Sequence, residues 1–211
     1  MTPLSGACGA VITGEAFCLR GLHIDRLRRR RCAARSHLDA FLDLFPLRDV
    51  RVFERGEVNR LALCKNAEAL RLTVTDYTDP RQAIEGADIV VSSMPMSRGL
   101  ELFLDTPWVK SGAYVNLIDL ARTWRQETLE QFDCIIIEDA VQEDEMSPQM
   151  IPAELIAEDL QDLVRGRASG RRNDLERIAF VFRGLAIGDL AIAILAYERA
   201  LKDKVGTYLP R

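Results

Sequence analysis

Four short polar segments of this sequence each follow directly on an apolar or β-branched run, and their side chains are the ones best placed to do chemistry. They are Glu54-Arg55 after "DVRVF", Ser92-Ser93-Met94-Pro95 after "DIVV", Asp119 after "YVNLI", and Glu138-Asp139 after "CIII". Ligands of an open parallel sheet bind outside the carboxyl ends of its strands. If the apolar runs are parallel strands, the four segments meet at one edge of one sheet.

The first segment carries the chemistry of a ribose-binding site. The Glu54 carboxylate can accept hydrogen bonds from both ribose hydroxyls of an adenosine, and it would repel a 2′-phosphate. Arg55 could pair with that phosphate, so the choice between NAD and NADP stays open. The alternative is that both residues are surface charges at the end of a strand.

The second and third segments suit a cofactor and a substrate. Ser92 and Ser93 are small enough to let a cofactor pass close to the backbone, although ordinary turn chemistry also explains them. The Asp119 carboxylate suits proton transfer to or from a substrate amine. Alternatively, Asp119 caps a helix or forms an ion pair with Arg122.

The flanking segments predict the elements that position these residues. Apolar runs predict strands, and helical spacing predicts helices. The expected strands cover 49–55, 72–77, 87–95, 112–119, 134–139 and 178–182; the expected helices cover 36–45, 57–70, 151–164 and 187–202, with one more beginning at Pro80 behind its cap Asp79. Strands that alternate with helices in this way form βαβ units. The expected fold is α/β, a Rossmann-type parallel sheet with flanking helices, and the acidic segment 138–150 is a candidate boundary loop.

Composition argues against several other classes of protein. The net charge is −4, and the basic run 28–31 has no aromatic neighbours, so no nucleic-acid partner is expected. Five cysteines without pairing spacing and only two histidines indicate reduced thiols in a cytoplasmic protein and no metal site. Arg183 and Asp189 interrupt the most hydrophobic segment, Ile178 to Ala196, so we expect a buried strand and a buried helix there and no membrane span.

A dinucleotide-binding turn is expected just before the first helix, and its glycines are missing. Such a turn needs glycine because its backbone takes positive φ and approaches the pyrophosphate closely. Arg29 and Arg31 stand at the first two glycine positions, and Ala34 stands at the third, where glycine or alanine fits. Arginine can pair with phosphate, but it cannot supply the missing steric room. Residues 28–31 are therefore better interpreted as a solvated basic arm.

Beyond this turn the sequence resembles the ornithine cyclodeaminase and mu-crystallin family. The matching stretches are "ARSHLDAF" (34–41), "VRVFER" (50–55), "AIEGADIVVSSMP" (83–95), "SGAYVNLIDLARTW" (111–124) and "IAFVFRGLAIGDLAIAILAYERALKDKVGTYLP" (178–210). The last stretch is the most specific, because a helix ending in "AYERA" and the "GTYLP" tail are typical of the family. The resemblance begins at about Ala34.

The resemblance implies an activity. Family members are homodimers that bind NAD(H) or NADP(H) on a Rossmann domain. Some convert ornithine to proline with release of ammonia, and others are alanine dehydrogenases or reductases of imines and ketimines. The implied substrate is therefore a small amino acid or an imine.

The resemblance also implies a role for each matching residue. Asp119 corresponds to the catalytic aspartate, and Glu54 corresponds to the ribose contact, with Arg55 beside it. The implied positions beside the cofactor or the substrate are Cys32, Ala33, Ser92, Ser93, Met94, Arg183 and Gly184.

The front of the chain departs from the family, whose members carry a substrate and dimer domain before the Rossmann domain. We expect an atypical segment at 1–32, a Rossmann-type NAD(P)-binding domain at 33–165, and a C-terminal part of the substrate and dimerisation domain at 166–211. The abrupt onset of the resemblance favours an out-of-frame or misassigned start that returns to frame near Ala33. Two functions stay open: an NAD(P)-dependent lyase or oxidoreductase of amino-acid metabolism, and a non-enzymatic small-ligand-binding protein or inactive remnant.

Overall fold

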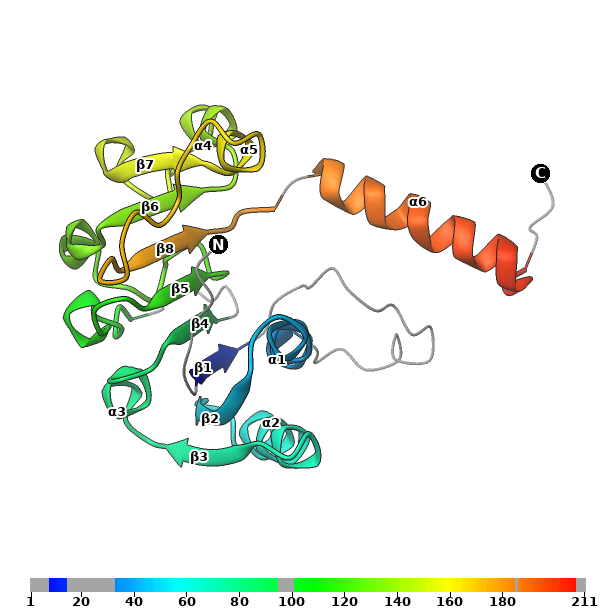
Figure 1. The fold of residues 1–211 in the computed structure, drawn as a ribbon, viewed down its shortest axis with the longest axis horizontal. Coiled ribbons are helices and arrows are strands. Elements are labelled where there is room, and N and C mark those ends of the chain that lie inside the picture. The colour runs from blue at the N-terminus through cyan, green and yellow to red at the C-terminus, as the bar shows by residue number, and fades with distance from the viewer. Residues whose placement is uncertain (1–7, 15–32, 95–100, 185, 208–211) are drawn as a thin grey trace.

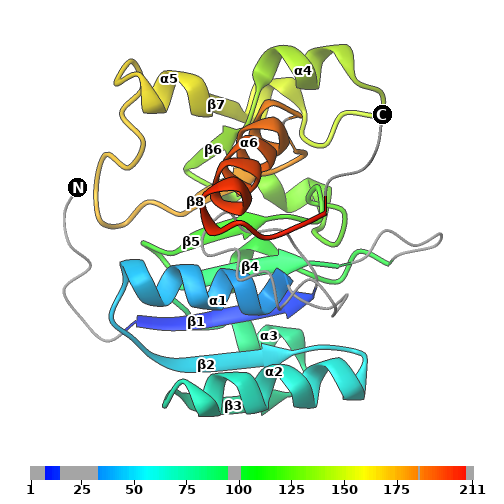
Figure 2. The ribbon, with the colours of Figure 1, turned by 90° about the vertical axis from the view of Figure 1, so that its right-hand side faces the viewer.

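The computed structural model describes residues 8–14, 33–94, 101–184 and 186–207, and in this part of the chain eight strands form one sheet with every pairing parallel. The strands are β1 (Cys8–Gly14), β2 (Leu47–Phe53), β3 (Thr73–Tyr77), β4 (Ile89–Ser93), β5 (Tyr114–Leu117), β6 (Cys134–Ile137), β7 (Ile156–Asp159) and β8 (Ile178–Val181). Their order is β3-β2-β1-β4-β5-β8-β6-β7, which Figure 2 shows running from β3 at the bottom to β7 at the top. The chain winds outward from β1 to β3 and then crosses back to β4, so the boundary between β1 and β4 is the switch point where ligands of such sheets bind.

The helices begin and end where local chemistry favours it. α1 (Ala33–Leu44) ends just before Pro46, which cannot continue a helix. α3 (Pro80–Ile84) begins with its proline, and the Asp79 carboxylate accepts the Arg81 N–H at 2.9 Å. The other helices are α2 (Glu57–Ala69), α4 (Ala140–Glu145), α5 (Leu160–Val164) and α6 (Ala186–Asp203), with 3₁₀ turns η2 (Thr106–Trp108), η3 (Gln126–Gln131) and η4 (Ala153–Leu155).

Both faces of the sheet are buried, because successive side chains of a strand point to opposite faces. On one face, Val91 of β4 packs in a cluster with Leu38 of α1 and Leu63 of α2. On the other face, Val90 packs in a larger cluster with the fully buried Trp124. This two-sided burial explains why the strands read as continuous apolar runs.

The sheet confirms the predicted α/β class, and most predicted elements lie within a few residues of their expected bounds. One prediction is wrong: 151–164 is not a single helix, because η4, β7 and α5 divide it. The pairing of β7 with β6 outweighs the local helical pattern there. The acidic segment 138–150, expected to be an irregular loop, contains α4.

Two segments that the sequence analysis set apart contribute strands to the same sheet. Residues 1–32 supply β1, which was not predicted and which pairs with β2 and β4 at the centre of the sheet. Residues 166–211 supply β8, which lies between β5 and β6. The described sheet therefore reaches beyond 33–165 at both ends.

Helix α6 projects from the sheet beyond β8 (Figure 1), and the expectation that it is buried is wrong for this chain. Its exposed apolar side chains include Ile187, Leu190, Ile194, Tyr197 and Leu201. Their spacing of three and four residues places them on one side of the helix. None of the described helices has the length and apolar character needed to cross a bilayer.

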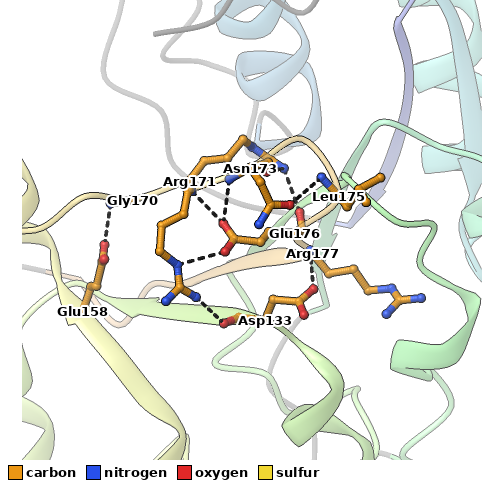
Figure 3. Close-up of polar contacts among 9 residues, drawn as sticks. Asp133, Glu158, Gly170, Arg171, Asn173, Leu175, Glu176 and Arg177 are labelled. Carbon is orange, nitrogen blue, oxygen red and sulfur yellow. Dashed lines mark hydrogen bonds and ion pairs between the residues drawn. The ribbon is translucent and has the colours of Figure 1, made fainter.

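The loop that leads into β8 is held by a carboxylate at the amino-terminal edge of the sheet. The Glu176 carboxylate accepts the Arg172 backbone N–H at 2.7 Å and the Arg172 Nε–H at 2.9 Å. The Arg177 N–H donates to Asp133 at 2.8 Å, directly before β6 (Figure 3). These contacts fix β8 against β6, so the carboxyl ends of both strands reach the same edge.

Candidate functional site

A buried hydrogen-bonded network joins the carboxyl ends of β4 and β5. The Ser92 hydroxyl lies 3.1 Å from the Asp119 Oδ1 atom, and the Trp124 Nε1–H donates to the Ser92 Oγ atom at 2.9 Å. The Thr123 hydroxyl donates to the Asp119 Oδ2 atom. An indole N–H can only donate a hydrogen bond, so the Ser92 Oγ atom accepts from Trp124. The Ser92 O–H therefore donates its hydrogen bond to Asp119. Each carboxylate oxygen of Asp119 therefore accepts a hydrogen bond from a hydroxyl group.

Asp119 is only 4% exposed, and its surroundings act on its pKa in two directions. Burial disfavours the charged form and raises the pKa of Asp119, whereas the hydrogen bonds from Thr123 and Ser92 act against that rise. The outcome is a pKa above the ordinary aspartate value. A carboxyl group tuned in this way is suited to exchange a proton at a sheet edge.

The turn after Asp119 has an unusual backbone. Leu120 and Ala121 both lie in the left-handed region, with φ of 60° and 55°. This conformation is costly for residues with a Cβ, and it is found most often at functional sites. The turn is tied to a neighbouring segment, because the Thr123 carbonyl accepts the N–H groups of Phe103 and Leu104, each at 2.9 Å.

On the opposite face of the same strands, two buried polar atoms have no hydrogen-bond partner among the described residues. They are the Ser93 Oγ atom and the Asn116 Oδ1 atom. Ser93 lies on the face that carries Val91, and Asn116 lies on the face that carries Tyr114, both of which belong to the side packed by α1 and α2. Ser93 also pairs in register with Gly14, at the switch point. A ligand could satisfy both atoms.

Glu54 and Arg55 lie just beyond β2, apart from the Asp119 network. The Glu54 Oε1 atom accepts the Gly56 N–H at 3.2 Å, and the Arg55 guanidinium lies 4.4 Å from the centre of the Phe103 ring. Phe103 also contacts Phe53 of β2, with ring centres 5.9 Å apart. Phe103 thus links the ribose-binding candidates to the turn after Asp119.

Arg183 and Gly184, beyond β8, are bound by two buried glutamates. The Glu138 Oε2 atom accepts the N–H groups of Arg183 and Gly184 at 3.1 and 2.6 Å. Burial raises the pKa of Glu138, and these backbone hydrogen bonds act against the rise. The Arg183 guanidinium pairs with the Glu143 carboxylate at 2.8 Å, so its charge is already neutralised within the protein.

The structure therefore brings together only part of the predicted site. Ser92 and Asp119 are in contact, and Ser93 lies beside them on the other face of β4. Met94 is the last residue described after β4, and its backbone hydrogen bond also acts against the rise in the pKa of Asp119. Ala33 begins α1, while Arg29, Arg31 and Cys32 lie outside the described residues.

Sequence reasoning missed Asn116, Thr123 and Trp124. A polar residue inside the apolar run "YVNLI" was the available sign for Asn116. No comparable sign marks Thr123 or Trp124, because their partners depend on the folding of the turn after β5.

Comparison with known proteins identifies the relatives of this chain. A family model described as "Ornithine cyclodeaminase/mu-crystallin family" matches residues 32–204. An uncharacterized cyclodeaminase of Sinorhizobium fredii is 28% identical over 189 residues, covering 82% of this chain and 55% of that protein. The ketimine reductase mu-crystallin of Macropus fuliginosus is 25% identical over 191 residues, covering 88% of this chain and 55% of that protein. The chain thus spans about half the length of these curated relatives.

Solved structures share the fold. Thermococcus litoralis Δ¹-pyrroline-2-carboxylate reductase, in complex with NADH and L-proline, has a TM-score of 0.77 and 23% identity, covering 96% of this chain and 61% of that one. An archaeal alanine dehydrogenase dimer with bound NAD has a TM-score of 0.73 and 20% identity, with the same coverage of both chains.

Proposed function

Because the chain belongs to the ornithine cyclodeaminase/mu-crystallin family, we propose that it binds a nicotinamide cofactor and exchanges a hydride between that cofactor and a small amino acid or its imine. Relatives named as alanine dehydrogenase, ketimine reductase and Δ¹-pyrroline-2-carboxylate reductase support this class of reaction. The reaction we favour is either conversion of ornithine to proline with release of ammonia or reduction of a related imine or ketimine.

The observation that carries the proposal is the buried Ser93 hydroxyl at the switch point between β1 and β4, which has no hydrogen-bond partner among the described residues. Buried hydroxyls nearly always have a partner, so this group fits a ligand that runs along the sheet edge. The Glu54 carboxylate, beyond β2, would hold the adenosine ribose through its hydroxyls. The described residues therefore fit a dinucleotide at both ends of its expected path.

The bound nicotinamide would supply the hydride acceptor or donor, and the chain's own residues would control the proton. Asp119 would hold or release a proton at the substrate nitrogen. Ser92 and Thr123 orient its carboxylate, and its raised pKa brings proton exchange closer to neutral pH. Gly184, held by Glu138, would shape the backbone beside the substrate.

We also propose that two copies associate through the apolar side of α6. Apolar side chains spaced three and four residues apart form the seam by which helices pack on one another. Ile187, Leu190 and Ile194 are all exposed in the single chain, which supports a partner surface. Sedimentation of the chain at several concentrations tests this, and a concentration-independent monomer would contradict it.

A second candidate is a non-enzymatic protein that binds a small ligand, and Arg183 favours it. A substrate carboxylate needs a basic partner, and the Arg183 guanidinium is already paired with Glu143. Under this proposal, a ligand binds at the same edge without turnover.

Cofactor-dependent melting tests the proposed function. A ligand at 100 times its Kd stabilises a protein by about 2.7 kcal/mol, which is measurable as a rise in Tm. We expect NADH or NADPH to raise the Tm and L-ornithine or an imine to change the cofactor absorbance. Melting that does not respond to millimolar NADH or NADPH would refute the proposal, and a response without turnover would favour the second candidate.

A further inference from the structure

We propose that Asn116 is a ligand-binding residue, whose side-chain oxygen accepts a hydrogen bond from an N–H or O–H donor of the nicotinamide cofactor, either its carboxamide or a ribose hydroxyl. This proposal rests on the proposed function. It adds to the site a residue for which the sequence analysis predicted no role.

The buried Asn116 side chain carries an acceptor that needs a donor. Asn116 is 7% exposed, and its Oδ1 atom finds no hydrogen-bond partner among the described residues. Buried polar side chains are almost always paired, so an unpaired acceptor indicates a donor from outside this part of the chain. A side-chain amide oxygen can only accept, which restricts the ligand atom to an N–H or O–H group.

Asn116 also lies close to Ser93 in the sheet. Asn116 pairs in register with Val91 of β4, and Ser93 lies two residues further along the same strand. Residues two apart on a strand point to the same face. The Ser93 hydroxyl, which has no partner among the residues that the structure describes, therefore lies diagonally across from Asn116, on the same face and at the carboxyl edge. A ligand that lies along this edge passes both residues.

The other unpaired buried atoms of the described residues do not share this position. Asn66 belongs to α2, and Asp105 is held through its other carboxylate oxygen by Arg125 at 3.8 Å. Only Ser93 and Asn116 occupy neighbouring strands beside the switch point. Two unpaired atoms together at the edge where the fold binds ligands are better explained by a ligand than by chance.

The two serines at the end of β4 differ in their hydrogen bonds, and this difference supports the same conclusion. Ser92 and Ser93 are consecutive, so their side chains point to opposite faces. The Ser92 hydroxyl is bonded to Asp119 and Trp124, whereas the Ser93 hydroxyl has no partner in the described part of the chain. One face of the strand end thus holds the proton-handling carboxylate, and the other face presents groups that need a ligand.

Asn116→Leu tests the proposal, with Asn66→Leu as a matched control. Asn116 is buried and Asn66 is half-buried, and each has one buried amide atom without a partner among the described residues, Oδ1 in Asn116 and Nδ2 in Asn66. Leucine is similar in size to asparagine, so neither variant should lower the Tm of the free protein. Asn116→Leu should weaken NADH binding, measured by titration calorimetry, by about threefold to tenfold, which is the usual effect of one neutral hydrogen bond. Asn66→Leu should leave NADH binding unchanged.

The outcomes separate this proposal from the proposed function. Wild-type protein that binds neither NADH nor NADPH refutes both. Wild-type binding with equal affinity in Asn116→Leu refutes only the role of Asn116. A marked fall in the Tm of free Asn116→Leu would show that the donor belongs to the chain itself, and weaker binding of L-proline or L-ornithine with unchanged NADH affinity would assign the donor to the substrate. Either result overturns the cofactor assignment.

Discussion

The Ser92 hydroxyl donates a hydrogen bond to the Asp119 carboxylate across 3.1 Å, which joins the ends of two neighbouring strands in a fully buried contact. Trp124 fixes the direction of this bond, because its indole N–H occupies the acceptor side of Ser92. Asp119 is therefore held by the protein in one orientation, with its charge supported by two hydroxyls. An oriented carboxyl group at the edge of the sheet is what a proton-transfer step requires.

Replacing the carboxylate tests this role directly. Asp119→Asn keeps the shape of the side chain but cannot exchange a proton. If the chain catalyses turnover, we expect the variant to bind NADH normally and to lose about a hundredfold or more in kcat, the usual contribution of a general acid or base. Steady-state assays with parallel NADH titrations measure both quantities. An unchanged kcat would remove Asp119 from the mechanism.

The raised pKa of Asp119 predicts a pH dependence of stability that needs no enzyme assay. The folded protein holds this proton more tightly than the unfolded chain, so the free energy of unfolding falls as pH rises between the unfolded and folded pKa values. Each unit of difference contributes about 1.4 kcal/mol. Urea titrations across this pH range should show a smaller fall in Asp119→Asn than in wild type, with the remaining fall due to Glu138, whose pKa is also raised.

Thr123→Val should widen that pH window. It removes a hydroxyl that stabilises the charged carboxylate, so the pKa of Asp119 should rise further and the fall in stability should extend to higher pH. Thr106→Val is the matched control, because Thr106 is equally buried but bonds to Thr128. The same pH profile in both variants would show that Thr123 does not tune Asp119.

The fold was largely predictable because the strands buried on both faces are continuous apolar runs. The prediction failed where pairing decides the structure. β1 contains two glycines and a short apolar run, and it is a strand because β2 and β4 flank it. The pattern of 151–164 favours a helix, but β7 pairs with β6 in parallel, with one irregularity in the register.

Only the site residues that directly follow a strand could be predicted from the sequence. Ser92 and Asp119 could be placed at one edge by counting strands. Their hydrogen bond spans 27 residues of sequence, and the bond between Trp124 and Ser92 spans 32. Such contacts depend on the folded turn at Leu120, so no local pattern marks them. The ion pair of Arg183 with Glu143 could not be predicted either, because it also joins residues that are far apart in the sequence.

Glu54 should set the preference between the two nicotinamide cofactors. Its negative charge repels a 2′-phosphate and accepts hydrogen bonds from a free ribose. We expect Glu54→Gln to move the ratio of NADPH to NADH affinity by about tenfold toward NADPH, since a nearby pair of surface charges contributes about 1 kcal/mol or more. Glu57→Gln removes a charge three residues away, in the first turn of α2, and should leave the ratio unchanged. Equal ratios in wild type and Glu54→Gln would exclude a ribose contact.

Gly112 tests how the amino-terminal edge holds β5 in place. Its φ of 81° is left-handed, and a Cβ there would collide with the Asp174 carbonyl oxygen. Its N–H also donates to the Leu175 carbonyl at 2.9 Å, which ties the start of β5 to the loop before β8. Gly112→Ala should therefore combine backbone strain with a clash and destabilise the protein by about 3 kcal/mol or more.

Gly166 is the control for this prediction, because it separates the strain from the clash. Its φ of 71° is similar, but no atom lies within 4 Å of the place a Cβ would occupy. Gly166→Ala should cost only the left-handed conformation, about 1 kcal/mol. Urea unfolding of both variants measures the difference. An equal loss of unfolding free energy in the two variants would mean that the loop before β8 moves to make room for the added methyl group. A loop that moves so easily could not fix the register between β5 and β8.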